Sequence, residues 1–287
     1  MTASMTGFAR RESVGAHGTL ICEIRSVNHR FLDASLRLPD SCRAIESELR
    51  QALARELRRG KVDCTVQHRP PEGATDLDVD DTALQKLLGR ARQLASSMPA
   101  QARINVLDLL RWPGVVREQS LDAEALLVEV RRLFEATLSD LVAARRREGA
   151  RLAELLLQRC VNLEEMVAAV RVRLPEVQLR VRERLEERLR ELGAELNRER
   201  IEQELVMLLQ RLDVAEELDR LTGHIAESRR TLATPEAAGR RLDFLLQEFN
   251  REANTLSSKS QDLETTRVAV DMKVVIEQMR EQVQNIE

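Results

Sequence analysis

Hydrophobic and polar residues alternate along the first seventy residues of the chain. In the segment GTLICEIRS, Leu20, Cys22 and Ile24 alternate with polar neighbours, and FLDASLRLP continues this pattern up to Leu38. A period of two places successive side chains on opposite faces of a strand, so both segments predict half-buried strands. We also expect strands in SMTGFAR, near the N-terminus, and in KVDCTVQHR, which begins at Lys61.

A helical repeat separates the last two of the four predicted strands. After Pro39, apolar residues recur every three or four positions from Ile45 to Leu57, and Gly60 ends the repeat. A helix of this length can cover one face of a small sheet. The sequence therefore predicts an α+β fold whose N-terminal domain, residues 1–72, is a mixed sheet with a covering helix.

The pattern is almost entirely helical after PPEGATD, a segment with Pro and Gly that marks a domain boundary. A helical connector, residues 73–120, contains a short helix that Asn105 caps, and its Trp112 is expected to be a packing anchor. A long coiled-coil-like region, residues 121–200, follows, and we expect Pro175 to interrupt its helices. The chain is thus predicted to be mostly helical, with long helices, beyond its first domain.

The C-terminal region, residues 201–287, ends in a seam of apolar residues. Five residues recur at alternating spacings of four and three: Met272, Ile276, Met279, Val283 and Ile286. That spacing is typical of a coiled coil, so the seam requires a partner helix. The partner lies either in the same chain or in a second subunit, and the sequence favours neither alternative.

One predicted helix of the C-terminal region has an unusual polar face. In RRLDFLLQEFNREANTLSSKS, which starts at Arg240, the apolar residues from Leu242 to Leu256 fall on one side. The opposite side carries Gln247 and Asn254, although Glu and Lys form helices more readily than amides. Two interpretations are open: a polar interface with another helix or subunit, or the wall of a functional site.

A second polar stripe lies upstream of that helix. Asp213, Glu217, Arg220 and His224 recur at spacings of four, three and four, which places them within an arc of roughly 60° on one helix. The stripe is either a solvated face with charge pairs or a site where carboxylates and an imidazole bind a divalent cation while Arg220 neutralises a phosphate. Together, the two stripes suit metal-assisted phosphodiester chemistry.

The segment RSVNHRF places further polar side chains between two predicted strands. Arg25, Asn28, His29 and Arg30 form either a polar hairpin loop or a compact phosphate-binding loop beside the sheet. Residues 1–72 carry twelve Lys and Arg against nine Asp and Glu, whereas the whole chain has a net charge of −3. A nucleic-acid surface on this chain must therefore be a local patch.

The composition narrows the class of protein. With 43% hydrophobic and 32% charged residues, the chain is expected to fold around real cores rather than to be intrinsically disordered. Aromatic residues make up only 2%, which argues against an aromatic platform for stacking bases. The four cysteines lack the paired spacing of a zinc site and are expected to be buried, reduced thiols. No apolar run approaches ~18 residues and no signal pattern opens the chain, so we expect a soluble cytoplasmic protein without a membrane partner.

Several longer strings are distinctive as a set. They run from one end of the chain to the other: SMTGFARRE, EIRSVNHRFLD, RLPD, RGKV, DLLRWPGV, QELVMLLQRLDVAEELDRLTGHI, GRRLDFLLQEFNREANTLSSKS and IEQMREQVQNIE. This set resembles the YicC/YloC family of bacterial endoribonucleases. The resemblance implies an endonuclease that prefers single-stranded RNA and needs a divalent metal cation, Mn²⁺ or Mg²⁺. It also implies a homo-hexamer of chains with an α/β N-terminal part and a helical C-terminal part.

The resemblance and the polar stripes together give a first hypothesis, a metal-dependent RNA phosphodiesterase that acts in RNA turnover or small-RNA regulation. Catalysis and RNA binding would then lie in the C-terminal region. The candidate catalytic groups and metal ligands are Glu217, His224, Glu248 and Glu252. The candidate RNA-binding residues are Arg25, Asn28, His29, Arg30, Lys61, Arg220, Arg240, Arg241, Gln247, Arg251, Asn254 and Lys259.

Competing hypotheses come from other functional classes. The chain is alternatively a non-catalytic RNA-binding or adaptor oligomer whose stripes form subunit contacts. A purely structural coiled-coil scaffold ranks last, because it leaves the amide face around Gln247 and Asn254 unexplained. Within the enzymatic hypothesis, the substrate's own 2′-hydroxyl is an alternative nucleophile, and that route requires a 2′,3′-cyclic phosphate on the new RNA end.

Overall fold

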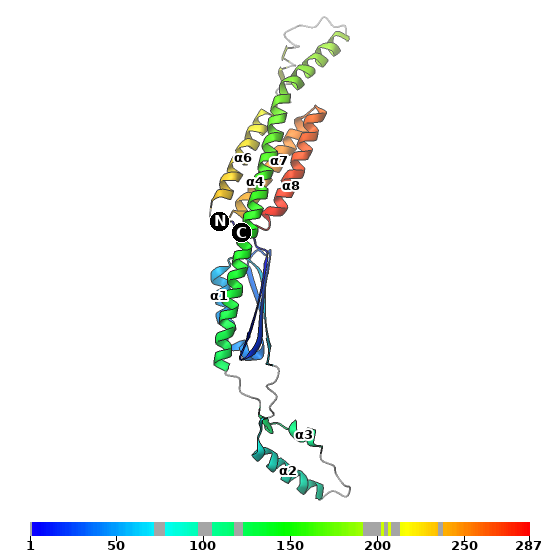
Figure 1. The fold of residues 1–287 in the computed structure, drawn as a ribbon. Helices are drawn as coiled ribbons and strands as arrows, with labels where there is room; N and C mark the ends of the chain where they lie inside the picture. Colours follow the sequence, from blue (N-terminus) through cyan, green and yellow to red (C-terminus); the bar gives the residue numbers. More distant parts are fainter. Residues whose placement is uncertain are drawn as a thin grey trace.

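The computed structural model is elongated, and one long helix runs through both of its halves (Figure 1). The four-stranded sheet lies in one half, and a helical bundle forms the other. The residues that the structure describes are 2–71, 78–96, 105–117, 123–191, 202–203, 206–207, 213–234 and 238–287.

The N-terminal half contains a mixed sheet, as predicted. Its strands follow the order β1-β2-β4-β3, with antiparallel pairing except for the parallel pair β3 and β4. The strands are β1 (Gly7–Gly15), β2 (Gly18–Val27), β3 (Leu32–Arg37) and β4 (Gly60–Arg69). A 3₁₀ turn, η1 (Asp40–Ile45), and the helix α1 (Glu46–Glu56) connect β3 to β4.

Two helices, rather than the single predicted one, pack on this sheet. Buried residues of β2 and β4, such as Leu20 and Val62, share a core with Leu53 of α1 and with Phe134 and Leu141 of α4. The helix α4 (Ala123–Glu191) contacts β1 and β2 directly. All four cysteines are buried and free, which confirms the expectation of reduced thiols.

The helix α4 continues through Pro175, so the expected interruption is wrong. A proline removes one backbone hydrogen bond and crowds the preceding turn, which usually kinks or ends a helix. Here Arg173 and Arg180, on either side of the proline, both bind Asp262 at the start of the helix α8 (Leu263–Val283). These two contacts hold α4 against the bundle on both sides of Pro175.

The connector between sheet and α4 contains short elements. They are β5 (Asp78–Val79), α2 (Asp81–Ser96), α3 (Val106–Leu110) and β6 (Val116–Arg117). The Asn105 side chain accepts a hydrogen bond from the Leu107 amide at 3.1 Å, which confirms the predicted cap. Trp112 is 59% exposed, so the expectation of a packing anchor is wrong for the fold of the single chain.

The C-terminal half is a helical bundle around a single apolar core. The second part of α4 packs with α6 (Ala215–Ala233), α7 (Gly239–Lys259) and α8. The predicted seam lies inside this core, because Met272, Ile276, Met279 and Val283 are all at most 3% exposed. Of the two alternatives for the seam, the structure shows the one within the chain.

A waist joins the two halves, and both chain ends lie there (Figure 1). The Ser4 amide donates to the Arg145 carbonyl of α4 at 2.9 Å, and the Met5 amide donates to the Asn285 carbonyl at 2.8 Å. The N-terminal segment passes so close to α4 that a Cβ on Gly149 would lie 2.3 Å from the Thr2 carbonyl oxygen. The waist therefore fixes the orientation of the bundle relative to the sheet.

Candidate functional site

The predicted amphipathic pattern of α7 is confirmed. Its apolar residues, among them Leu245, Phe249 and Ala253, are buried against the bundle core. The adjacent helix α6 contributes Leu221 and Ile225 to the same core. Polar residues of α6 and α7 that border this shared core can therefore meet along one contact line, whereas Gln247 and Asn254 of the amide face lie towards α8.

A cluster of three groups that could bind a metal ion lies on this contact line. One ligand atom each from His224 of α6 and from Glu248 and Glu252 of α7 lie within 4.8 Å of one another. The spacing of four residues places Glu248 and Glu252 on the same side of α7. The His224 ring packs edge-on against Phe249, with ring centroids 5.7 Å apart. Of the four predicted ligands, Glu217, His224, Glu248 and Glu252, the structure thus brings three close together within a single chain.

Arg220 compensates the charge of the most buried member of the cluster. Glu252 is only 3% exposed, and Arg220 donates to its Oε1 at 3.3 Å. Arg220 also binds Glu216 one turn earlier on α6. The hydrogen bond to Glu252 and the two negative charges raise the pKa of the Arg220 guanidinium. Arg220 therefore remains a fixed cation beside the three ligand groups.

Glu217 has a different neighbour from the other candidate ligands. Its Oε1 forms an ion pair with Lys259 at 2.8 Å, and Lys259 also donates to the Asp213 carbonyl at 3.1 Å. Glu217 is 5% exposed, and its Oε2 has no hydrogen-bond partner among the described residues. The structure thus brings Glu217 and Lys259 together but does not place Glu217 within the three-residue cluster.

The predicted stripe of α6 is shorter than its sequence spacing indicates. Asp213 lies before the helix, which begins at Ala215, so the expectation that it shares a helical face is wrong. Its side chain accepts a hydrogen bond from the Ala215 amide at 2.9 Å. Short acids form such local bonds readily and therefore favour positions before a helix.

The remaining candidate residues of α7 lie on its exposed side. Arg251 approaches Glu248 at 3.9 Å, and Arg241 binds Glu227 of α6. Arg240, also exposed, lies in the first turn of the helix, at the waist end. Gln247 donates to Asp243, and Asn254 donates to Asn250, both at 3.3 Å. Several positive and polar groups thus surround the cluster on the solvent side.

The N-terminal candidates form a separate group at the waist end of the sheet. Arg25, Asn28, His29, Arg30 and Lys61 are all exposed. His29 bonds the Phe31 carbonyl at 3.0 Å through Nδ1, and the Arg30 guanidinium lies 5.2 Å from the centre of the Phe31 ring. No hydrogen bond or ion pair joins this group to α6 or α7 within the described part of the chain. Its role in RNA binding stays a prediction.

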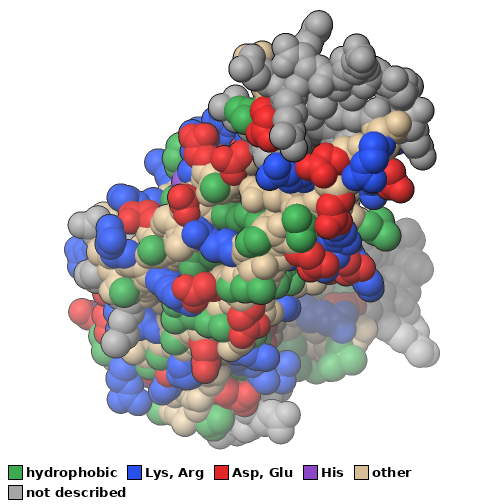
Figure 2. Space-filling view, turned by 90° about the horizontal axis from the view of Figure 1, so that it is seen from above, with side chains coloured by type: hydrophobic (Ala, Val, Ile, Leu, Met, Phe, Trp, Pro, Cys, Tyr) green, Lys and Arg blue, Asp and Glu red, His purple; other side chains and the backbone are tan. Residues whose placement is uncertain are grey.

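Charges on the surface are interspersed rather than segregated. Figure 2 shows acidic and basic side chains side by side over the described part of the face seen from the bundle end. This distribution agrees with the low net charge of −3 and with the expectation of local patches. Any electrostatic attraction of a polyanion would therefore depend on small groups such as the arginines of α6 and α7.

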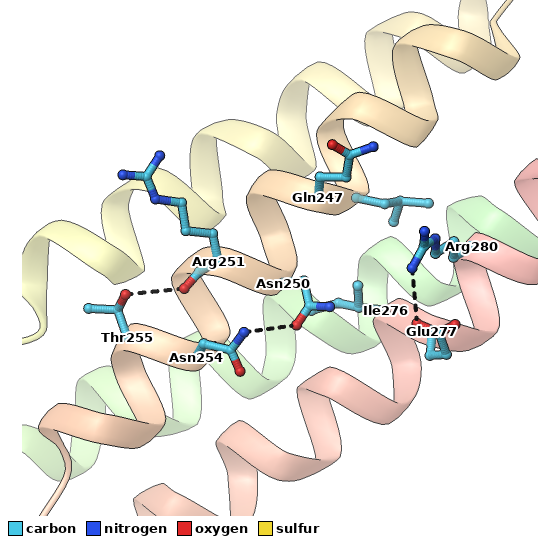
Figure 3. A pocket seen from close by; sticks show the side chains of 9 residues that line it. Gln247, Asn250, Arg251, Asn254, Thr255, Ile276, Glu277 and Arg280 are labelled. Carbon is cyan, nitrogen blue, oxygen red and sulfur yellow. Dashed lines mark hydrogen bonds and ion pairs between the residues drawn. The ribbon is translucent and has the colours of Figure 1, made fainter.

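A groove between α7 and α8 contains residues that the sequence reasoning missed. Asn250, Thr255 and Arg280 line it together with the candidates Gln247 and Asn254 (Figure 3). Asn250 belongs to the same amide-rich segment as Gln247 and Asn254, and this composition was the one sequence feature that could have indicated it. Its orientation towards α8 depends on the packing of α8, and the sequence does not give that packing.

Comparison with known proteins identifies the family. Residues 2–154 match the N-terminal region of YicC-like endoribonucleases, and residues 170–287 match their C-terminal region. The chain therefore belongs to the YicC-like endoribonuclease family.

Two relatives match over their full lengths. The "Probable endoribonuclease YicC" of Haemophilus influenzae is 41% identical over 288 residues, with 100% of both chains covered. The protein of the same name from Clostridioides difficile is 29% identical over 293 residues, again with full coverage of both. Among the described helices, none has the length and apolarity that crossing a bilayer requires.

Proposed function

We propose that this protein is a divalent-metal-dependent endoribonuclease that cleaves single-stranded RNA at the contact line of α6 and α7. The observation that carries the proposal is the approach of His224, Glu248 and Glu252 to within 4.8 Å of one another. Membership of the YicC-like endoribonuclease family supports RNA as the substrate. The biological setting that we propose is RNA turnover or small-RNA regulation.

The donor set fits a divalent cation. Carboxylate oxygens suit Mg²⁺ and Mn²⁺, and an imidazole in the set adds preference for a transition metal, so Mn²⁺ fits best. The carboxyl of Glu252 is buried and, among the residues that the structure describes, has one cationic partner, Arg220, on one of its oxygens. A bound cation would supply Lewis-acid polarisation of a phosphoryl oxygen. Glu217, expected as a fourth ligand, remains to be tested by substitution because its partner here is Lys259.

The arginines around the cluster bind and orient the RNA backbone in this proposal. Arg220 lies beside Glu252, and Arg251 and Arg241 lie on the exposed side of α7. A guanidinium presents a planar set of donors that matches the oxygens of a phosphate. These cations would hold the phosphates on either side of the scissile bond and offset the charge that develops there.

Assembly into a homo-hexamer is part of the proposal. Within one chain, the loop with Asn28, His29 and Arg30 shares no hydrogen bond or ion pair with the described residues of α6 or α7. Subunit association would allow this loop and Lys61 of one copy to guide RNA towards the cluster of another. The family resemblance, together with this separation, motivates a measurement of subunit number by light scattering.

A cleavage assay tests the proposal. A labelled single-stranded RNA is incubated with the wild type, His224→Ala, Glu248→Gln and Glu252→Gln, each with Mn²⁺ and with excess chelator. We expect metal-dependent cleavage by the wild type and a loss of at least about 100-fold in each variant, because each removes one ligand. Glu281→Gln, an exposed acid of α8, is the control and should cleave like the wild type.

The other outcomes are equally informative. Undiminished cleavage by all three variants would move the site elsewhere on the chain. Binding of RNA without cleavage by the wild type would identify a non-catalytic RNA-binding adaptor. A 2′,3′-cyclic phosphate on the product would show that the substrate's own 2′-hydroxyl attacks, whereas its absence at all times would favour attack by water.

A further inference from the structure

A groove lies between α7 and α8 (Figure 3), and its lining includes none of the three cluster residues. Its volume is about 430 Å³. Leu246 and Ile276, which are 3% and 1% exposed, form its apolar floor. Pockets that hold planar organic ligands have similar volumes and combine an apolar base with a few polar groups.

Side-chain amides provide the polar groups of this groove. Asn254 Nδ2 donates to Asn250 Oδ1 at 3.3 Å, which leaves the Asn254 carbonyl oxygen and the Asn250 amide nitrogen available for a ligand. Gln247 donates to Asp243, so its own carbonyl oxygen is also available. Neighbouring donors and acceptors of this kind form paired hydrogen bonds with the edge of a nucleobase.

The amides of the groove suit the edge of a base, and the arginines among its charged side chains, Arg251 and Arg280, can hold the adjoining phosphate at the rim. Arg280 and Glu277 lie together at one side, with a closest approach of 4.0 Å. The edge of a base is uncharged and has both donors and acceptors, so it matches the side-chain amides.

Arg251 connects the groove with the three-residue cluster. It lines the groove, and its Nη1 also lies 3.9 Å from Glu248 Oε2. In Figure 3 its side chain extends over α7 towards α6. A helix with its side chains is about 10 Å wide, so the groove and the cluster are separated by little more than the ridge on which Arg251 stands. One RNA strand crossing this ridge can occupy both.

We propose that the groove binds the base of a nucleotide beside the scissile phosphate and so gives the enzyme a base preference. This inference rests on the proposed function, because it assigns the substrate contact next to the same cleavage site. Asn250 and Asn254 read the base edge, and Arg251 holds the intervening phosphate. The unusual amide face of α7 is thereby explained as a recognition surface.

Binding in the absence of metal tests this inference separately from cleavage. Labelled oligoribonucleotides of A, C, G or U alone are titrated in chelator with the full-length wild type and with the double variant Asn250→Ala, Asn254→Ala. We expect the wild type to prefer one base by about tenfold, and the double variant to bind all four within about twofold. Alanine is the better helix former, so the double variant should retain α7.

Gln278→Ala is the matched control, because it removes an exposed amide of α8 that does not line the groove. It should keep the preference of the wild type. Equal binding of all four oligoribonucleotides by the wild type, or an unchanged preference in the double variant, would overturn the inference. Base-selective binding without any cleavage would instead retain the groove and refute the nuclease proposal.

Discussion

Glu252 shows how burial determines the chemistry of a single residue at this site. A carboxylate that is 3% exposed requires compensation of its charge, and Arg220 provides it from the neighbouring helix. A divalent cation held by His224 and Glu248 would provide a second source of compensation. Arg220 and the cation would therefore both stabilise the same buried charge. Without Arg220, the stability of the protein should depend more strongly on the bound cation.

Substitution of Arg220 tests this relation. Arg220→Ala should lower the melting temperature in chelator, because Glu252 then lacks its partner, at a cost of roughly 1–3 kcal/mol. Addition of Mn²⁺ should raise the melting temperature of the variant more than that of the wild type, as measured by thermal shift. Arg230→Ala, which removes an exposed arginine that pairs with Glu227, is the control. An identical response of wild type and Arg220→Ala to Mn²⁺ would contradict the relation.

At the residue scale, the sequence indicated residues that lie close together in the fold, but not the partner of each side chain. The stripes and the family strings together named His224, Glu248 and Glu252, and the structure brings these three together. The ion pair of Glu217 with Lys259 joins residues of two helices that are 42 positions apart. Periodicity reports the face of one helix, so it does not reveal which face of another helix lies opposite.

At the element scale, the position of α8 depends on how the helix begins and on which helix it contacts. The start of α8 is fixed by Asp262, which accepts a hydrogen bond from the Thr265 amide at 3.0 Å and binds Arg173 at 2.6 and 3.2 Å. Arg180 adds a third contact at 2.9 Å, although the Asp262 side chain is only 8% exposed. One side chain thus caps α8 and fastens it to α4.

The contacts of Asp262 predict a pH-dependent stability. The hydrogen bonds from Arg173, followed by those from Thr265, hold the pKa of Asp262 well below its usual range. A lowered pKa in the folded state stabilises the protein above the unfolded value of about 3.9, and this stabilisation is lost as the pH falls through the folded value. Asp262→Ala should therefore cost about 2–3 kcal/mol near pH 7 in urea unfolding, and less as the pH falls below about 4.

Asp262→Asn separates the two roles of this residue. Asparagine caps helices as well as aspartate does but has no charge for Arg173 and Arg180. It should therefore retain the cap, lose the charged part of the stabilisation, and show a weaker pH dependence than the wild type. Equal stability of the wild type and Asp262→Ala at pH 7 would refute this account of α8.

Elements with a simple pattern were predicted, and elements that depend on distant contacts were not. Alternation predicted the strands because their outer faces are exposed to solvent and their inner faces are buried. The continuity of α4 through Pro175 was missed, and the contacts on both sides of the proline involve Asp262, which is 87 residues away in the sequence. The packing of α4 on the sheet was missed as well, since an amphipathic pattern does not name the surface that it covers.

At the scale of the whole molecule, two apolar cores are joined by α4 and by the waist. Arg145 lies at this junction, 2% exposed, and donates to the Ser4 carbonyl at 2.6 Å and to Glu287 at 2.8 Å. Removal from water lowers the pKa of Arg145, while the charge of Glu287 opposes that shift. The two ends of the chain are thus fastened to the middle of the longest helix.

Substitution of Arg145 tests the importance of the waist. Arg145→Ala leaves Glu287 and the Ser4 carbonyl without their donor, and breaking a buried pair costs about 3–5 kcal/mol. Urea unfolding should show a loss of this size. Arg146→Ala, the exposed neighbour on α4, should change the free energy of unfolding by less than about 0.5 kcal/mol. Similar losses in the two variants would indicate that the waist contributes little.

The central claim is that His224, Glu248 and Glu252 bind a metal ion. The most direct test is a titration of the full-length protein with Mn²⁺, in which electron paramagnetic resonance measures the concentration of the free ion. We predict one site per chain in the wild type, at least tenfold weaker binding in His224→Ala and Glu252→Gln, and unchanged binding in Glu281→Gln. Equal Mn²⁺ affinity in the wild type and in both ligand variants, or no binding by the wild type, would contradict the assignment of a metal site to α6 and α7.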